Sequence, residues 1–322
     1  MLAKAADLLV DGAVGLSRRF AIPELVVGLT LCAFGTSAPE LFVNGSAALA
    51  GRNALVLGNV LGSNVFNTLL VLGIGSLIFP LRVRRSTLRW ELPFGVLACL
   101  VFLILANDAW FGANASILSR WDGLFLLGCF GVFLAYIMLF TFEDLPSTGE
   151  EEGAVSATRC VVYVCLGLIG LPLAAQLVLA GALGMTISLG ISEELVGLTL
   201  VSAGTSLPEL AATAAAAWRK RADLAVGNVV GSNIFNLLLV LGASSLLSPV
   251  ESVVELNTDG CIFVIACVAV VGFVAIQGLL SRGAGAILLT GFVAYLAFLS
   301  LRESGAAQSQ LATGWAGSEL HD

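Results

Sequence analysis

The same seven-residue motif occurs twice in this chain of 322 residues, and each copy places a glutamate inside a long apolar stretch. The first copy is Gly-Thr-Ser-Ala-Pro-Glu-Leu at 35–41, with Glu40, and the second is Gly-Thr-Ser-Leu-Pro-Glu-Leu at 204–210, with Glu209. A charged side chain at the centre of a bilayer costs roughly 2.5–3.5 kcal/mol on insertion scales, so such residues usually mark ion or proton paths. Two of them in equivalent positions predict a cation site at a repeat interface.

Other oxygen donors accompany each glutamate. Proline has no backbone N–H, so we expect each motif to kink or unwind its helix and to free carbonyl oxygens at membrane depth. Oxygen ligands without thiolate or imidazole suit calcium, sodium or magnesium. The alternative interpretation is helix packing by small and hydroxyl residues, including a GxxxG pair at Gly58 and Gly62, but it does not explain the glutamates. The candidate cation ligands are Glu40, Glu209, Thr36, Thr205, Ser37, Ser206, Ser63, Asn67, Ser232 and Asn236.

The two glutamates together carry two negative charges. One calcium ion neutralises them, as do two sodium ions or two protons, and this equivalence is the basis for exchange. Calcium is favoured over magnesium because magnesium dehydrates reluctantly and is seldom held by all-protein cages.

The composition indicates a protein that crosses the membrane several times. Hydrophobic residues make up 58% of the chain and charged residues 11%, against about 25% charged residues in a typical soluble domain. The net charge of -7 lies mostly in loops and tails, and we expect no nucleic-acid partner. The seven cysteines form no CxxC pair, and the single histidine, His321, is next to last. Zinc sites and histidine relays are therefore not expected, nor is any cofactor, and an enzyme has little support because no base is available to activate a serine.

The hydropathy pattern predicts an all-α protein of about ten transmembrane helices in two five-helix repeats. The first repeat spans 1–142, an acidic linker 143–159, the second repeat 160–302 and a polar tail, expected to be disordered, 303–322. The predicted spans are 2–17, 23–49, 53–79, 90–107, 121–141, 160–187, 192–217, 222–248, 259–281 and 283–301.

A constant offset of 169 residues relates the two repeats. It superimposes Thr36 on Thr205 and the segment 58–67 on 227–236, and no gap is needed over some fifty residues. Because each repeat has an odd number of spans, the second must be inverted in the membrane, as in secondary transporters.

The basic residues test this topology independently. Eleven of the fifteen fall on one side of the predicted membrane and four, Lys4, Arg52, Arg120 and Arg302, on the other. The positive-inside rule then places both termini outside. Met1 maps onto Gly170, some ten residues into the sixth span, so we expect the first helix to be truncated.

The doubled motif resembles the sodium/calcium exchanger branch of the calcium:cation antiporter superfamily, in its prokaryotic type. The resemblance extends over nearly the whole chain and includes the G-N-x-x-G-S-N-x-F-N segments. It implies a central site shared by the second, third, seventh and eighth helices, with alternating access produced by sliding of the first and sixth helices. It assigns calcium to Glu40, Glu209 and the carbonyls of Thr36 and Thr205. Sodium is assigned to Ser37, Ser63, Asn67, Ser206, Ser232, Asn236 and the carbonyls of Ala33 and Ser202.

The resemblance leaves the coupling ion open. Many relatives have aspartate where this chain has Asn236, so the stoichiometry stays undetermined. Proton-coupled relatives have acidic residues in the third and eighth helices, where this chain has serine and asparagine, which favours sodium. We therefore expect a calcium exporter of a prokaryotic cytoplasmic membrane that exchanges calcium for sodium. The alternatives are a proton-coupled antiporter, potassium co-transport and, more distantly, a cation channel.

Overall fold

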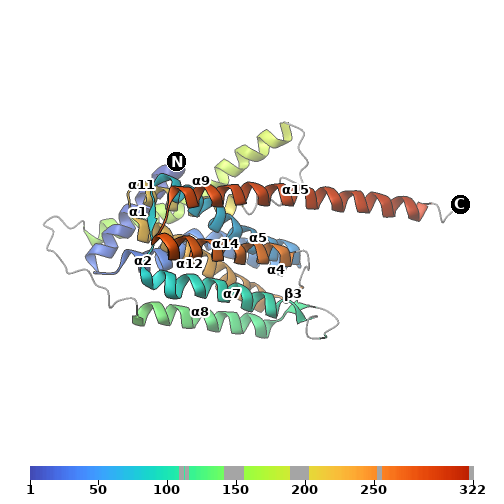
Figure 1. Cartoon of the computed structure of the whole chain (residues 1–322), viewed down its shortest axis with the longest axis horizontal. Helices are drawn as coiled ribbons and strands as arrows, with labels where there is room; N and C mark the ends of the chain where they lie inside the picture. The colour runs from blue at the N-terminus through green and yellow to red at the C-terminus, as the bar shows by residue number, and fades with distance from the viewer. Residues whose placement is uncertain (109–111, 113–115, 141–155, 189–202, 252–255, 319–322) are drawn as a thin grey trace.

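The computed structural model describes residues 1–108, 112, 116–140, 156–188, 203–251 and 256–318, and in these residues the chain is mostly helical (Figure 1). The elements of the first half are α1 (Leu2–Arg19), α2 (Glu24–Val27), η1 (Gly28–Cys32), α3 (Ala33–Thr36), α4 (Ala38–Leu49), α5 (Asn53–Val65), η2 (Phe66–Val71), α6 (Leu72–Ile78), β1 (Leu81–Arg82), η3 (Thr87–Glu91), α7 (Leu92–Leu105), β2 (Ile117–Leu118) and α8 (Arg120–Phe140). Those of the second half are α9 (Ala157–Ser188), α11 (Leu207–Trp218), α12 (Ala222–Ile234), η5 (Phe235–Val240), α13 (Leu241–Leu247), β3 (Val250–Glu251), α14 (Asn257–Gln277), β4 (Leu279–Leu280) and α15 (Arg282–Ser318). The η elements are π-helical turns within longer helices.

Seven helices in the described residues are long and apolar enough to cross a membrane, and the bent pair 24–36 and 38–49 makes an eighth if it counts as one span. The first helix, α1, is not among them because five of its residues are charged: Lys4, Asp7, Asp11, Arg18 and Arg19. The predicted span 192–217 falls partly on residues outside the described ranges. The protein is thus a multi-pass helical membrane protein, and ten helices stay a prediction that these spans are compatible with.

The offset found in the sequence recurs in the element boundaries. Adding 169 to the bounds of α4, α5, η2, α6 and β1 gives the bounds of α11, α12, η5, α13 and β3. Even the π-helical turn of the third predicted span is repeated at the same place in the eighth. The two halves therefore fold alike because the same local sequence, with its glycines and asparagines, is present in both.

Two short strand pairs show that the second half is inverted. Strand β1 pairs antiparallel with β4, and β2 pairs antiparallel with β3. The helix α14 connects β3 to β4 and has 21 residues, which is about 31 Å of helix and close to the thickness of the bilayer core. The equivalent strands β1 and β3 therefore lie at opposite ends of the molecule, and the helices that lead into them run in opposite directions.

The arginines divide between these two ends. Near β1, Arg84 pairs with Asp223 at 2.7 Å and Arg221 pairs with Glu24 at 2.9 Å. Near β3, Arg302 pairs with the buried Asp259 at 2.9 Å. This arrangement agrees with the predicted division of the basic residues, whereas the end that faces the cytoplasm stays a prediction.

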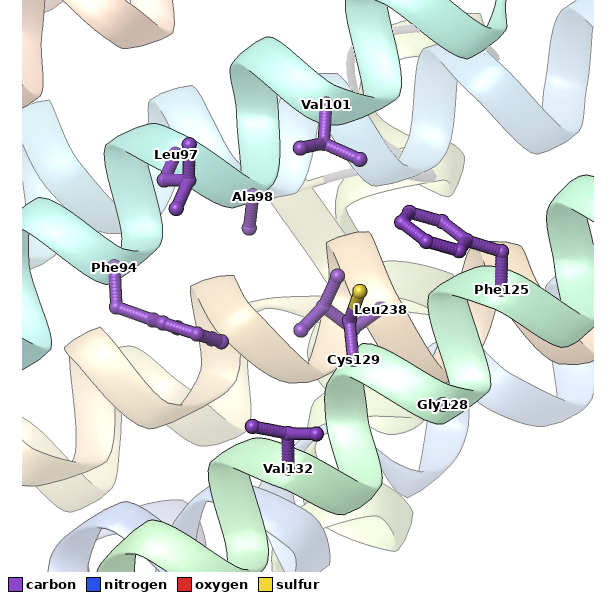
Figure 2. A pocket seen from close by; sticks show the side chains of 9 residues that line it. All are labelled: Phe94, Leu97, Ala98, Val101, Phe125, Gly128, Cys129, Val132 and Leu238. Atoms are coloured by element: carbon purple, nitrogen blue, oxygen red, sulfur yellow. The ribbon is translucent and has the colours of Figure 1, made fainter.

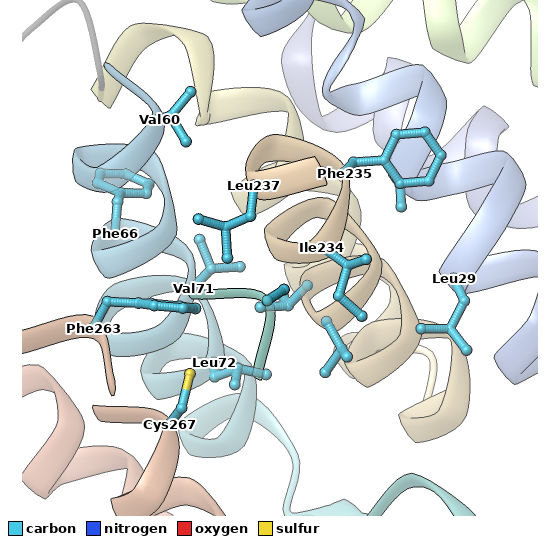
Figure 3. Packing of buried hydrophobic residues seen from close by; sticks show 14 of the residues in the cluster. Leu29, Val60, Phe66, Val71, Leu72, Ile234, Phe235, Leu237, Phe263 and Cys267 are labelled. Carbon is cyan, nitrogen blue, oxygen red and sulfur yellow. The ribbon is translucent and has the colours of Figure 1, made fainter. Parts of the chain in front are cut away.

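Apolar packing between α5–η2, α12–η5 and α14 surrounds the molecular centre. Figure 3 shows Phe66, Leu237 and Phe263, one from each of these elements, among the buried side chains of this cluster. Helix α12 crosses α2 and η1 at glycines, and a Cβ on Gly227 would lie 2.7 Å from the main-chain oxygen of Leu25. Side chains at this crossing would hold the helices apart, so the glycines allow their backbones to touch.

One expectation about the chain's end is wrong. The tail 303–322 was expected to be disordered, but α15 continues to Ser318 and extends beyond the rest of the molecule (Figure 1). The segment has no proline, and its four alanines favour helix, so a helix already nucleated by the preceding span continues through it despite three glycines.

Candidate cation site between the two repeats

The two repeated motifs break their helices at the predicted place. The helix α3 ends at Thr36, α4 begins at Ala38, and the two are bent by 45°. Pro39 lies in the first turn of α4, where its missing N–H is tolerated. In the second copy α11 likewise begins directly after Ser206, with proline in its first turn.

Each break places a glutamate at the beginning of a helix in the middle of the protein. Glu40 lies in the first turn of α4 and Glu209 in the first turn of α11. Both side chains are fully buried. The positive end of the helix dipole favours a carboxylate at such a position. Within the described ranges, neither glutamate forms a salt bridge with lysine or arginine. In the described residues, therefore, no basic side chain compensates the negative charge of either glutamate.

Hydrogen bonds across the repeats join the two motifs. Ser37 donates its hydroxyl to Glu209 Oε1 at 2.9 Å, and Ser206 donates to Glu40 Oε1 at 3.4 Å. Each serine thus holds the glutamate of the other repeat, not the one three residues further along its own chain. The two motifs lie against each other, and the site belongs to both halves.

The second oxygen of each carboxylate is free to bind a cation. Glu40 Oε2 and Glu209 Oε2 are buried and have no hydrogen-bond partner among the described residues. A buried acceptor without a partner costs about 1–3 kcal/mol, and more when it is charged. A cation bound at these oxygens removes that cost, which makes the pair chemically suited to hard cations.

The third and eighth spans contribute unequally to this centre. Ser232, on α12, donates to Glu209 Oε1 at 3.4 Å and so lies beside a carboxylate. Its counterpart Ser63 on α5 is buried and has no partner in the described part of the chain. The side-chain amide of Asn67 has none there either, whereas Asn236 donates its Nδ2 to Asn64 and keeps its Oδ1 unpartnered.

The threonine hydroxyls serve the structure of the break. Thr36 donates to the carbonyl of Cys32 at 3.0 Å and lies 3.4 Å from Asn228 Oδ1. Thr205 donates to Asn59 Oδ1 at 3.3 Å. Thr36 and Glu40 are four residues apart, a spacing that places two residues on one face of a regular helix. The bend between them separates the two residues into different helices. The hydroxyl of Thr36 thus bonds within its own helix and also lies near an asparagine of the other repeat, while its carbonyl stays a predicted ligand.

The resemblance also assigned sodium to the carbonyls of Ala33 and Ser202, and the structure describes only the first of them. The carbonyl of Ala33 accepts the backbone N–H of Ser37 at 3.0 Å, and the hydroxyl of Thr36 lies 3.4 Å from it. Ser202 lies outside the described residues.

Sequence reasoning missed the asparagines that surround the site. Asn59 and Asn228 are equivalent by the offset of 169, and each accepts a threonine hydroxyl from the opposite repeat. Asn44, one turn after Glu40, is fully buried and both its amide atoms lack partners in the described ranges. The signal was present, because Asn59 and Asn64 recur at the same offset within the second motif.

An apolar pocket between α7, α8 and η5 does not belong to this site. Its volume is about 400 Å³, and Phe94, Phe125 and Leu238 are among its lining residues, as Figure 2 shows. Its lining side chains are apolar apart from the Cys129 thiol, so they offer none of the oxygen ligands that a hard cation prefers. The polar centre is a separate feature, packed between the broken helices.

These features define a class of protein. Two inverted repeats with broken helices, and a buried pair of carboxylates shared between them, form the architecture of a membrane-embedded cation antiporter. The chain matches the sodium/calcium exchanger protein family over residues 1–139 and 160–301, and it belongs to that family.

Individual relatives agree with this membership. The chain is 37% identical to the inner membrane protein YrbG of Escherichia coli over 318 residues, with 92% of each chain covered. It is 28% identical to the sodium/calcium exchanger MaX1 of Methanosarcina acetivorans, covering 92% of this chain and 95% of that one. Its structure is similar to that of the sodium-calcium exchanger NCX_Mj soaked with 10 mM Na⁺, with a TM-score of 0.78, 29% identity, and coverage of 92% and 94%. The chain therefore belongs to a family of membrane cation antiporters.

Proposed function

We propose that this protein exchanges calcium for sodium across the cytoplasmic membrane by alternating access. The observation that carries the proposal is the pair Glu40 and Glu209, fully buried, each held by a serine of the other repeat, and each with one oxygen left without a partner among the described residues. Two carboxylates without basic partners require two positive charges, which one calcium ion or two sodium ions supply. Occupation by either ion removes the net charge that otherwise opposes movement of the site across the bilayer.

The proposed calcium ligands are Glu40, Glu209 and the carbonyl oxygens of Thr36 and Thr205. For sodium we propose Ser37, Ser206, Ser63, Asn67, Ser232 and Asn236. The relatives named as sodium/calcium exchangers support sodium as the coupling ion. The neutral serines and asparagines of the third and eighth spans support it as well, since they offer oxygens without a proton to exchange. The same proposal includes a first repeat that ends at residue 142, a second repeat that begins at residue 160, and both termini on the outer side of the membrane.

Proton coupling is the second candidate. It is favoured by the uncompensated carboxylates, because two protons neutralise them as well as two sodium ions do. The coupling ion is therefore the quantity that the experiment must determine.

The test is calcium uptake into proteoliposomes that contain sodium and are diluted into sodium-free buffer. A sodium ionophore alone should abolish uptake, whereas a proton uncoupler should leave it intact. Uptake that collapses only with the uncoupler, under an imposed proton gradient, would replace sodium by protons in the proposal. Steady calcium conductance without any gradient of a second ion would contradict exchange altogether and indicate a channel.

A further inference from the structure

One buried asparagine connects the main chain of the second repeat with a proposed sodium ligand of that repeat. Asn64 lies on α5 and is fully buried. Its Nδ2 donates to the main-chain oxygen of Asn233 at 3.2 Å, and its Oδ1 accepts the Nδ2 of Asn236 at 3.1 Å. No role in the proposed exchange has so far been assigned to Asn64.

These two bonds determine the orientation of both amides. The main-chain oxygen of Asn233 can only accept, so the atom of Asn64 that faces it must be the amide nitrogen. The other end of Asn64 is then its oxygen, which can only accept, and the atom of Asn236 that faces this oxygen must be a donor. The Oδ1 of Asn236 is consequently directed away from Asn64, and it has no partner among the described residues.

The spacing along α12 and η5 relates Asn236 to a residue that contacts a carboxylate. Asn236 follows Ser232 by four residues, about one helical turn, and the hydroxyl of Ser232 donates to Glu209 Oε1. An amide oxygen is a good ligand for a hard cation, whereas an amide N–H₂ repels it. Reversing the amide of Asn236 would set two oxygens against each other at Asn64 and direct N–H groups towards the cation.

The first repeat lacks the same control, and the sequence shows why. The residue equivalent to Asn64 is Asn233, whose Nδ2 donates to the hydroxyl of Thr68 at 2.9 Å. The residue equivalent to Thr68 is Leu237, which has no hydroxyl, so Asn64 donates to a main-chain oxygen instead. The side-chain amide of Asn67, equivalent to Asn236, has no partner in the described part of the chain.

We propose that Asn64 is a positioning residue that directs the amide oxygen of Asn236 towards the cation, so that the second repeat presents a prearranged sodium ligand and the first repeat an adaptable one. This inference rests on the proposed function, because it concerns the orientation of a proposed sodium ligand. Residues that orient metal ligands typically change affinity by about 10- to 100-fold when they are replaced. The expected effect is therefore on cation affinity and exceeds any effect on folding.

The experiment compares Asn64→Leu with a matched control, Thr68→Val, in the full-length protein reconstituted into proteoliposomes. Each substitution removes a buried hydrogen-bonding side chain from the interface between α5–η2 and α12–η5, but only the first removes the partner of Asn236. The measured quantity is the external sodium concentration that halves calcium uptake, together with the unfolding temperature in detergent. Asn64→Ser is included as well, because its hydroxyl lowers the cost of burial if the leucine variant does not fold.

We expect both Asn64 variants to raise the half-inhibiting sodium concentration roughly 10- to 100-fold, and Thr68→Val to leave it unchanged. In an Asn236→Leu background, Asn64→Leu should add little, since the two residues act through one oxygen. Lower unfolding temperatures with an unchanged sodium response in the Asn64 variants would show a purely structural role and overturn the inference. Wild-type uptake that does not respond to sodium would instead refute the sodium coupling itself, and the inference with it.

Discussion

Replacing Glu209 by glutamine tests whether the buried carboxylate pair is the cation site. The substitution preserves the size and shape of the side chain. The remaining carbonyl oxygen can still accept the hydroxyl hydrogens of Ser37 and Ser232, which lie 2.9 and 3.4 Å from Oε1. The amide nitrogen then occupies the position of Oε2, the oxygen that has no partner in the described part of the chain. We therefore expect the protein to fold and insert normally while a charged ligand is exchanged for an N–H donor.

The size of the effect follows from the burial of Glu209. Two unit charges about 4 Å apart attract by about 4 kcal/mol at an effective dielectric constant of about 20, and calcium carries two charges. The attraction between Glu209 and calcium is then about 8 kcal/mol. Losing only half of it, about 4 kcal/mol, would already weaken calcium binding by close to 1,000-fold at about 1.4 kcal/mol per factor of ten. Calcium exchange by the Glu209→Gln variant should consequently fall below detection at calcium concentrations that saturate the wild type.

The assay is sodium-driven uptake of radiolabelled calcium into proteoliposomes, with Glu251→Gln as the matched control. Glu251 is an exposed residue of β3, far in sequence from the motif, so its variant should transport like the wild type. Glu40→Gln should behave like Glu209→Gln, because the two carboxylates share one site. Wild-type uptake by either buried variant, at equal protein content in the vesicles, would refute the reasoning.

Three further predictions concern neighbouring features. Asn236→Asp adds a third negative charge opposite the Asn64 oxygen, so it should change the sodium dependence of calcium uptake more than the unfolding temperature; kinetics identical to the wild type would argue against Asn236 as a ligand. Gly227→Ala places a Cβ 2.7 Å from the Leu25 oxygen and should destabilise the protein by roughly 1–3 kcal/mol in thermal unfolding, while Gly272→Ala, which meets nothing within 4 Å, should not; equal effects would contradict the close crossing of α12 and α2. Arg219 pairs with Asp7 and Asp11 of α1, and because these acids are about half exposed, Arg219→Gln should cost less than about 1 kcal/mol of stability. If α1 slides during transport, these ion pairs must break, so the same variant should exchange calcium faster at low salt, where the pairs are strongest. An unchanged exchange rate at low salt would show that the ion pairs do not limit the movement of α1.

Local features of the sequence predicted the breaks in the helices. A proline beside glycine, threonine and serine cannot continue a regular helix, and α3 and α4 separate at Ser37 as expected. The period of 169 predicted both the number of repeats and the equivalence of their elements, which extends to the π-helical turns η2 and η5. The tail was misjudged because composition alone does not show that a helix, once begun in the membrane, propagates through polar residues.

The partners of the candidate ligands could not be predicted in the same way. Helical periodicity relates residues of one segment, and in a regular helix it would place Thr36 and Glu40 on one face. The bend of 45° between them cancels that relation, and the serine of one repeat instead bonds to the glutamate of the other, 172 or 166 positions away in the chain. Such a pairing depends on how two helices cross, which the glycines at the crossing permit but do not specify in the sequence.

The membrane location, the internal repeat, the broken helices and the residue types available for cations can all be read from the order of residues in the chain. These properties follow from hydropathy, spacing and backbone chemistry, each of which acts over a few residues or repeats along the chain. The folded arrangement adds that Ser37 bonds to Glu209, that one oxygen of each glutamate is left without a partner among the described residues, and that Asn236 bonds to Asn64. Hydrogen-bond donors and acceptors find their partners in space, and inverted repeats bring together residues that no local pattern relates.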